Sequence, residues 1–463
     1  MTLWGGRFTE PLSQVVWDFT SDPADRRLLL VDIHGSIAHV RALDAAGLVS
    51  DEEARDLVAG LEQMSEEAAA GRFTYEPTDE DVHTAVERRL VELVGDVGNK
   101  VHTGRSRNDQ VALDLRLYLV AAATGRMGDI DRLVSVLADR AEQVADVVVP
   151  SYTHLQQAQP VSLGHPLAAY AWMLLRDRER FADAAGRIGV SPLGAGAGGG
   201  STLSLRPDVA AAEAGFEAVF TNSLDAVASR DFVAEYVFAC AQLMAHLSRF
   251  AEDLVLWSSA EFAWITIPDS HATGSSALPH KKNPDVAELV RSRAAVVLGD
   301  LVTMLAMQKG LPLAYNRDLQ EDKRAVFHAD DTAAGSLVVL TELVGVIEFH
   351  PPHPAAETVA MVLAERLVSR GVPFRDAHRQ VGALLSRLDV DGRSLGDVGE
   401  EDVEGSAITL ADIEPSDPDE AARSLRSPGS GSPQSVLGQV KELRRRLDVA
   451  QPSAGMKRGR DDS

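Results

Sequence analysis

The stretch VAEYVFACAQLMAHLSRFAEDL, residues 233–254, decides the fold. Its apolar positions repeat about every 3.5 residues, which is the period of one face of a long α-helix. These positions are Val233, Val237, Cys240, Met244, Leu247, Ala251 and Leu254. A run of this length predicts a helix of many turns.

Three further runs show the same pattern, at residues 113–148, 286–307 and 325–347. Strand signals are weak by comparison, because alternating β-branched runs are short and aromatic residues make up only 5% of the chain. Long amphipathic helices bury more than one stripe only when other helices surround them. The sequence therefore predicts an all-α fold with a central long-helix bundle, and any apolar stripe left over predicts an oligomer.

Proline and glycine breakers divide the chain into three expected domains. They are an N-terminal helical domain at residues 1–110, a central long-helix bundle at 111–352 and a small C-terminal helical domain at 353–463. The stretch 415–433 is crowded with Pro, Ser, Gly and Asp, which predicts a long loop. Residues 451–463 are expected to form a disordered, solvated tail.

Composition excludes several classes of function. The formal net charge of −24 argues against nucleic acid and anionic membranes, because both need a basic face. The first nine residues lack a secretory signal, and no apolar run approaches the roughly 20 residues of a membrane span. We therefore expect a soluble, cytoplasmic protein with a small-molecule or protein partner. Cys240 is the only cysteine and is expected to be a buried apolar side chain rather than a catalytic thiol.

The segment TGSSALPHKKNPD, residues 273–285, is the most informative for chemistry. Its glycine and proline breakers predict a loop, and its polar density suits the recognition of carboxylates. Lys281 offers charge and Asn283 offers directional donors. Ser275 or Ser276 can carry a proton if nearby cations or backbone N–H groups lower its pKa. The alternative is a solvated surface loop, which the scarcity of lysine in this chain disfavours.

A second polar cluster, VHTGRSRNDQ at residues 101–110, precedes a long helical run. Two arginines beside a helix N-terminus make a natural anion site. Asn108 or Asp109 is also expected to act as the N-cap of that helix, and a cap and an anion site can coexist.

Two more segments carry candidate residues. PSYTHLQQAQPVSLGH at residues 150–165 contains His154, although a lone histidine is more often structural than catalytic. KGLPLAYNRDLQEDK at residues 309–323 is a polar turn between two apolar helices, and by itself it also fits a simple capped connection. It offers Tyr315, Asn316, Gln320 and Lys323.

Together these segments resemble the aspartase/fumarase superfamily, whose hallmark GSSxxPxKxNP appears here as GSSALPHKKNP at residues 274–284. Within the superfamily the chain is most similar to the branch that cleaves argininosuccinate into arginine and fumarate. The similarity covers residues 1–350 densely. Its motifs are LWGGRF at 3–8, DIHGSIAH at 32–39, EDVHTAVERRL at 80–90, HTGRSRNDQV at 102–111 and YTHLQQAQP at 152–160.

The resemblance implies a three-domain fumarase/aspartase-like fold that assembles as a homotetramer, with active sites shared between neighbouring subunits. It implies that Ser275 exchanges a proton with the substrate and that His154, paired with Glu288, is the second acid/base element. We assign Ser275 as the base, and the sequence leaves that direction open. Lys281 completes the catalytic set and, with Asn283, would hold the carboxylates of the fumarate half.

The same resemblance gives the residues expected to bind argininosuccinate. They are Ser21, His83, Arg107, Asn108, Thr153, Ser276, Asn283, Tyr315, Gln320 and Lys323. Removing a proton beside a carboxylate creates a dianionic intermediate that cations and N–H donors must stabilise. Since side chains supply all of these groups, no metal and no organic cofactor is expected.

Two alternatives stay open. His280 is similar to the adenylosuccinate branch of the superfamily, so another fumarate-releasing lyase, such as adenylosuccinate lyase, is the first alternative. The second is a non-catalytic structural protein of the crystallin type. The presence of His154, Ser275, Lys281 and Glu288 argues against it.

Overall fold

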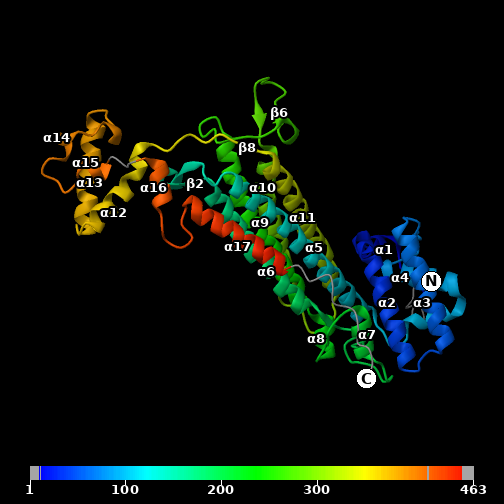
Figure 1. The fold of residues 1–463 in the computed structure, drawn as a ribbon. Coiled ribbons are helices and arrows are strands. Elements are labelled where there is room, and N and C mark those ends of the chain that lie inside the picture. Colours follow the sequence, from blue (N-terminus) through cyan, green and yellow to red (C-terminus); the bar gives the residue numbers. More distant parts are fainter. Residues whose placement is uncertain (1–9, 11, 414–416, 451–463) are drawn as a thin grey trace. The chain divides into compact units, whose positions relative to one another are not determined.

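The computed structural model describes residues 10, 12–413 and 417–450, and most of them are helical (Figure 1). Four of its longest helices coincide with the four apolar runs, which confirms the prediction of an all-α chain built on long helices. The five longest described helices are α5 (Arg107–Gln143), α6 (Gly164–Ile188), α9 (Asp231–Ser258), α10 (Asp285–Gln308) and α11 (Asp322–Val346).

Contacts divide the described residues into two compact units, each assembled from three separate stretches of chain. Unit 1 comprises the described parts of residues 1–128, 178–244 and 293–334. Unit 2 comprises those of residues 129–177, 245–292 and 335–463. The expectation of three domains with limits near residues 110 and 352 stays a prediction.

The N-terminal part of unit 1 is a group of three helices around one apolar core (Figure 1). They are α2 (Leu29–Ala45), α3 (Asp51–Ala69) and α4 (Val82–Val94). α3 begins where it does because Ser50 and Glu53 form a capping box. Leu43, Leu57 and Leu90 are completely buried in the core, so each helix presents one apolar stripe to the others.

A buried polar network joins α5, α9 and α11 within unit 1. The hydroxyls of Tyr118 and Tyr236 donate to the two carboxylate oxygens of Asp330, at 2.9 and 2.6 Å. Cys240 lies on the same helix as Tyr236 and is completely buried, which confirms the prediction of a structural thiol. Because each tyrosine hydroxyl has a charged acceptor, the network leaves these buried groups satisfied.

The glycine-rich segment 194–200 of unit 1 is a close-packed turn. Gly194 and Gly196 have φ angles of 99° and 57°, which favour glycine, and their N–H groups donate to Asp109. The remaining elements of unit 1 are short. They are α1 (Gln14–Thr20), η1 (Pro23–Leu28), η2 (Gly95–His102), β3 (Val190–Ser191), α7 (Pro207–Ala214), β4 (Ala218–Val219), α8 (Ser223–Ala228) and η4 (Arg317–Glu321). β3 and β4 pair in parallel.

Unit 2 contains an antiparallel hairpin of β1 (Val148–Thr153) and β2 (Gln156–Ser162). The helical run predicted for residues 113–148 is therefore wrong at its end, because α5 stops at Gln143 and Val148 pairs with Ser162. Two further strand pairs are very short. They are β5 (Ile265–Thr266) with β8 (Glu348–Phe349), and β6 (Thr273–Gly274) with β7 (Lys282–Asn283), and η3 (Asp269–His271) lies between β5 and β6 in sequence.

The C-terminal part of unit 2 has its own apolar core, which includes Leu363, Leu367, Leu384 and Ile408. Its elements are η5 (Ala356–Val359), α12 (Ala360–Ser369), α13 (Phe374–Val390), η6 (Leu395–Asp397), α14 (Glu400–Val403), α15 (Leu410–Ile413) and α16 (Pro418–Ser424). The last helix, α17 (Pro433–Ala450), lies instead along the long helices, where Arg444 pairs with Asp139 of α5 (Figure 1).

The long loop predicted at residues 415–433 is partly wrong, because α16 forms inside it. Asp417 caps α16 by accepting the N–H of Asp419, and Pro418 occupies the first helical position. Residues 415 and 416 and the predicted tail at 451–463 lie outside the described residues. None of the described helices combines the length and the apolar character that a membrane span requires.

Candidate active site

An open cavity of about 430 Å³ lies in unit 1, beside a smaller one of about 60 Å³. The two have six lining residues in common, and we treat them together as the unit 1 cavity. The shared residues are Glu80, Asp81, Arg107, Val111, Tyr315 and Arg317. Most of these side chains are polar, so the cavity suits a charged small molecule.

Arg107 occupies the first turn of α5 and is fixed by acidic neighbours on the cavity wall. Its Nε lies 3.2 Å from Asp81, its Nη1 lies 3.5 Å from Glu87, and the same Nη1 donates to Gln110 at 2.9 Å. Although burial acts to raise the pKa of Asp81, the nearby His83 and Arg107 lower it overall. A pre-oriented guanidinium of this kind can bind a carboxylate without reorganising.

The helix cap differs from the prediction. Ser106, not Asn108 or Asp109, caps α5, because its Oγ accepts the N–H of Asn108 at 3.2 Å. Asp109 reaches back and accepts the N–H of Ser106 at 2.9 Å, which completes a reciprocal cap. Asn108 is thereby free of the capping role and lines the cavity, where its amide donates to the Ala197 carbonyl at 3.4 Å.

Of the two arginines expected to bind an anion, only Arg107 lines the cavity. Arg105 is 7% exposed and its Nη1 donates to Ser36 at 3.0 Å. Its charge acts instead on the buried carboxylates Asp32 and Asp114.

Three predicted residues enter the cavity from the segment before and at the start of α11. Tyr315, Gln320 and Lys323 all line it. Gln320 donates to the Thr20 carbonyl at 3.2 Å, and Lys323 is 6% exposed with its Nζ 3.1 Å from Asp322. The structure therefore brings the predicted segment to the same place as Arg107 and Asn108.

Two further residues behave differently. Ser21 does not line the cavity, although Thr20 and Asp22 on either side of it do, and its buried Oγ has no partner among the described residues. Asn316 turns back on its own loop and donates to the carbonyls of Pro312 and Ala314.

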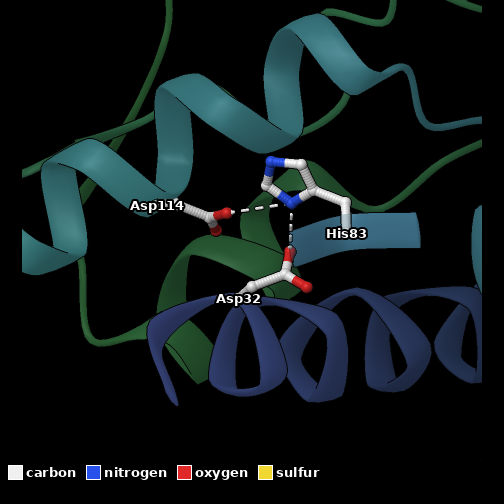
Figure 2. A group of neighbouring side chains, drawn as sticks. All are labelled: Asp32, His83 and Asp114. Carbon is white, nitrogen blue, oxygen red and sulfur yellow. Dashed lines mark hydrogen bonds and ion pairs between the residues drawn. The ribbon is translucent and has the colours of Figure 1, made fainter. Parts of the chain in front are cut away.

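His83 lines the smaller part of the cavity and is 1% exposed. Its Nδ1 lies 2.9 Å from Asp32 and 3.4 Å from Asp114, as Figure 2 shows. Burial and the charge of Asp32 raise the pKa of Asp114 well above its usual range. Burial also acts to raise the pKa of Asp32, but His83 and Arg105 lower it overall. Sequence reasoning missed both aspartates, although Asp114 is a single acid inside the apolar run at residues 113–148 and Asp32 opens the motif at residues 32–39.

The predicted Thr153 and His154 lie at the tip of the β1–β2 hairpin in unit 2. His154 and Leu155 form its two-residue turn, with φ angles of 54° and 55°. Positive φ at both turn residues matches the twist of an antiparallel hairpin, but costs free energy for side chains other than glycine. The side chain of His154 is therefore exposed at the tip of the hairpin.

The predicted loop at residues 273–285 also lies in unit 2 and is closed by the short β6–β7 pairing. The Oγ of Ser275 accepts N–H groups from Ala277 at 3.2 Å and Leu278 at 3.1 Å. Two amide donors stabilise the oxygen when it carries negative charge, which is what a serine base needs. Ser276 and Lys281 are exposed, and Asn283 is half-buried.

Glu288 is exposed on the first turn of α10, where it lies 3.8 Å from Arg291. The structure does not bring Glu288 to His154 within unit 2, and His154 has no hydrogen-bond partner among the described residues of one chain. The pairing of His154 with Glu288 stays a prediction.

Comparison with known proteins gives a consistent result. The family described as lyase matches residues 6–299, and the family described as argininosuccinate lyase C-terminal matches residues 357–418. The chain is 46% identical over 456 residues to the argininosuccinate lyase of Desulforudis audaxviator, covering 96% of this chain and 99% of that one. It is 47% identical over 408 residues to the argininosuccinate lyase of Moorella thermoacetica, covering 87% and 88% of the two chains.

Solved structures share the fold. The crystal structure of EDDS lyase in complex with formate has a TM-score of 0.80 at 26% identity, covering 94% of this chain and 88% of that one. The 3-carboxy-cis,cis-muconate lactonizing enzyme from Pseudomonas putida has a TM-score of 0.72 at 21% identity, covering 94% and 99%. The second similarity concerns the fold alone.

Proposed function

This chain belongs to the argininosuccinate lyase family and is a carbon–nitrogen lyase, and we propose that it cleaves argininosuccinate into arginine and fumarate at sites shared between chains. The observation that carries the catalytic assignment is the pair of backbone N–H groups held by the Oγ of Ser275. They lie in a loop that also holds Lys281 and Asn283.

The proposed reaction is a β-elimination in two proton transfers. Ser275, as the alkoxide, takes a proton from the carbon next to a succinyl carboxylate, and the electron pair moves into that carboxylate. Lys281 and Asn283 stabilise the resulting dianion. The electron pair then forms the carbon–carbon double bond of fumarate while the carbon–nitrogen bond breaks. His154, oriented by Glu288, gives its proton to the departing guanidinium nitrogen.

The unit 1 cavity is proposed to bind the parts of the substrate that do not react. Argininosuccinate carries carboxylates at both ends and a guanidinium between them. Arg107, Lys323 and the Asn108 amide are donors for the carboxylates. Glu80 and Asp81 lie on the same wall and offer acceptors for the cationic groups.

We propose that the assembly is a homotetramer. Supporting this, α10 leaves a row of large aliphatic side chains in water within unit 1. Val296, Leu298, Val302 and Leu305 are 51%, 48%, 65% and 57% exposed. A second copy of the chain fits this surface, because a symmetric oligomer buries the same apolar stripe on every subunit. A neighbouring copy would also supply the partner that His154 lacks within one chain.

The activity is tested by following the ultraviolet absorbance of fumarate, with argininosuccinate and adenylosuccinate offered separately and no metal or nucleotide added. We expect fumarate from argininosuccinate, and a strongly reduced rate from a matched Ser275→Ala preparation. Release from adenylosuccinate alone would assign the chain to the other branch of the superfamily. A protein that releases fumarate from neither would support the crystallin-type alternative.

A further inference from the structure

In the buried cluster of Asp32, His83 and Asp114, only His83 has been given a role so far, as a residue that lines the unit 1 cavity and is expected to bind substrate. The three side chains come from α2, α4 and α5 and offer one nitrogen and two oxygen atoms within 4.8 Å of one another. We propose that they form one proton-sharing unit, in which Asp32 and Asp114 are positioning residues that fix the ring of His83 with Nε2 toward the substrate. The proposal rests on the proposed function of the unit 1 cavity.

The geometry assigns one ring hydrogen. Nδ1 of His83 faces oxygens of both carboxylates, at 2.9 Å for Asp32 and 3.4 Å for Asp114, so this nitrogen keeps its hydrogen. Figure 2 shows the other ring nitrogen pointing away from both acids. Since His83 lines the cavity beside Gln320 and Lys323, Nε2 is the ring atom left to meet a substrate group.

The protonation of Asp32 and Asp114 explains how two buried carboxyl groups can lie so close together. Two carboxylates this close and fully buried cannot both be ionised at low cost. His83 and Arg105 favour ionised Asp32, while burial and the charge of Asp32 keep Asp114 protonated. Other charged groups also act on the cluster. They are Asp25, Asp81 and Arg107.

The three residues also have the spacing of a divalent-cation site, but their hydrogen bonds favour a proton. Oδ1 of Asp32 accepts the amide N–H of Gln110 at 2.5 Å and also faces Nδ1 of His83. A cation at this oxygen would have to displace the donors that already point at it. A carboxylate that accepts two N–H groups is already occupied by them, and its hydrogen bond to one ring nitrogen fixes the tautomer and orientation of the histidine.

Asp32 and Asp114 have different roles in the proposal, and replacing each of them by asparagine distinguishes these roles. Asp114→Asn has the shape of a protonated aspartic acid but cannot ionise. It should lower kcat/KM less than about tenfold at neutral pH and extend activity to higher pH, where ionisation of Asp114 would add a second negative charge beside Asp32. Asp32→Asn removes the charge that fixes the ring and should lower kcat/KM about 10–100-fold at every pH.

The matched control is Asp177→Asn. Asp177 is also completely buried and lies 2.7 Å from Nδ1 of a histidine, His246, but neither residue lines the unit 1 cavity. This variant should lose stability while keeping the pH profile of the wild type. The proposal is overturned if Asp114→Asn keeps the wild-type profile, if it falls as far as Asp32→Asn at every pH, or if the purified chain contains one tightly bound metal ion.

A measurement without substrate separates this proposal from the proposed function. Histidine labelled with ¹⁵N, with the His83 signals assigned by their loss in His83→Gln, should show hydrogen on Nδ1 in the wild type. Asp32→Asn should change that tautomer. If the tautomer is as expected while argininosuccinate yields no fumarate, the cluster stands and the proposed function fails. Hydrogen on Nε2 alone would refute the cluster, whatever the activity, and would do so even if Asp114→Asn does not fold.

Discussion

Asp322 lies 2.6 Å from the Nε of Arg230, and both side chains are completely shielded from solvent. The other oxygen of the same carboxylate lies 3.1 Å from the Nζ of Lys323. One buried carboxylate at the start of α11 therefore pairs with two buried cations. Because Lys323 lines the unit 1 cavity, this ion pair also fixes the position of a predicted substrate-binding group.

Replacing Asp322 by asparagine should destabilise unit 1 strongly, because it leaves two buried cations without a charged partner. We expect a loss of about 3–5 kcal/mol in the free energy of unfolding, together with a raised KM for argininosuccinate. Urea unfolding at fixed protein concentration measures the first and steady-state kinetics the second.

Asp331→Asn is the matched control for this loss. Its partner is Arg27, and their side chains are 61% and 36% exposed. An exposed ion pair of this kind contributes about 0–1 kcal/mol. Equal losses in Asp322→Asn and Asp331→Asn would show that burial does not make the first pair special.

The long helices could be predicted because their signal is local and repeated. An apolar residue every three or four positions identifies a helix when the pattern recurs over many turns, as at residues 233–254. The β1–β2 hairpin could not be predicted from the sequence, because its turn is His154-Leu155 rather than a glycine or asparagine pair. α16 was hidden by a composition typical of loops, although Asp417 and Pro418 are a good helix start.

The candidate site shows a similar division. Arg107, Tyr315 and Lys323 were predicted from motifs, and the structure places them on one cavity. Asp32 and Asp114 were missed, because each is a single acid on its own helix and their proximity arises only when α2 and α5 pack around His83. Sequence motifs identify the segments that contain candidate site residues. They do not show which side chains from different helices lie close enough to share a proton.

Ser275→Ala should reduce kcat about 10²–10⁴-fold and leave KM close to that of the wild type, because a proton carrier matters only in the transition state. Initial rates of fumarate release give both constants. Ser276→Ala is the control, since it removes a neighbouring hydroxyl from a substrate-binding candidate, and we expect its main effect on KM. If Ser276→Ala instead loses kcat while Ser275→Ala stays active, the base is Ser276.

Shared sites predict complementation between two inactive chains. His154→Asn and Ser275→Ala each remove one proton carrier, so neither homotetramer should turn over substrate. After unfolding and refolding together, some mixed sites would receive both intact residues from different chains. We expect partial recovery of fumarate release, with single-variant refolding as the control. Mixed tetramers confirmed by mass spectrometry that remain inactive would rule out the shared site.

The stability of the fold should depend on pH through Asp109. This side chain is completely buried, and its carboxylate accepts three backbone N–H groups. Burial outweighs these hydrogen bonds and raises the pKa of Asp109 from 3.8 to about 6. The folded chain therefore holds this proton more tightly than the unfolded chain does. The stabilisation that comes from this tighter proton binding is fully present below pH 3.8, and it is lost as the pH rises through about 6.

Asp109→Asn cannot ionise, so the pH dependence appears as a difference between the two proteins. Relative to the variant, the wild type should lose about 3 kcal/mol of unfolding free energy as the pH rises from about 4 to about 7. Urea unfolding across this range, at constant protein concentration, measures the difference. Asp208→Asn is the control of opposite sign. The hydrogen bond from Arg206 lowers the pKa of the exposed Asp208 to about 2, so that contribution is lost as the pH falls. If the wild type and Asp109→Asn follow parallel curves, the three amide donors hold Asp109 ionised in the folded chain and burial is the weaker effect.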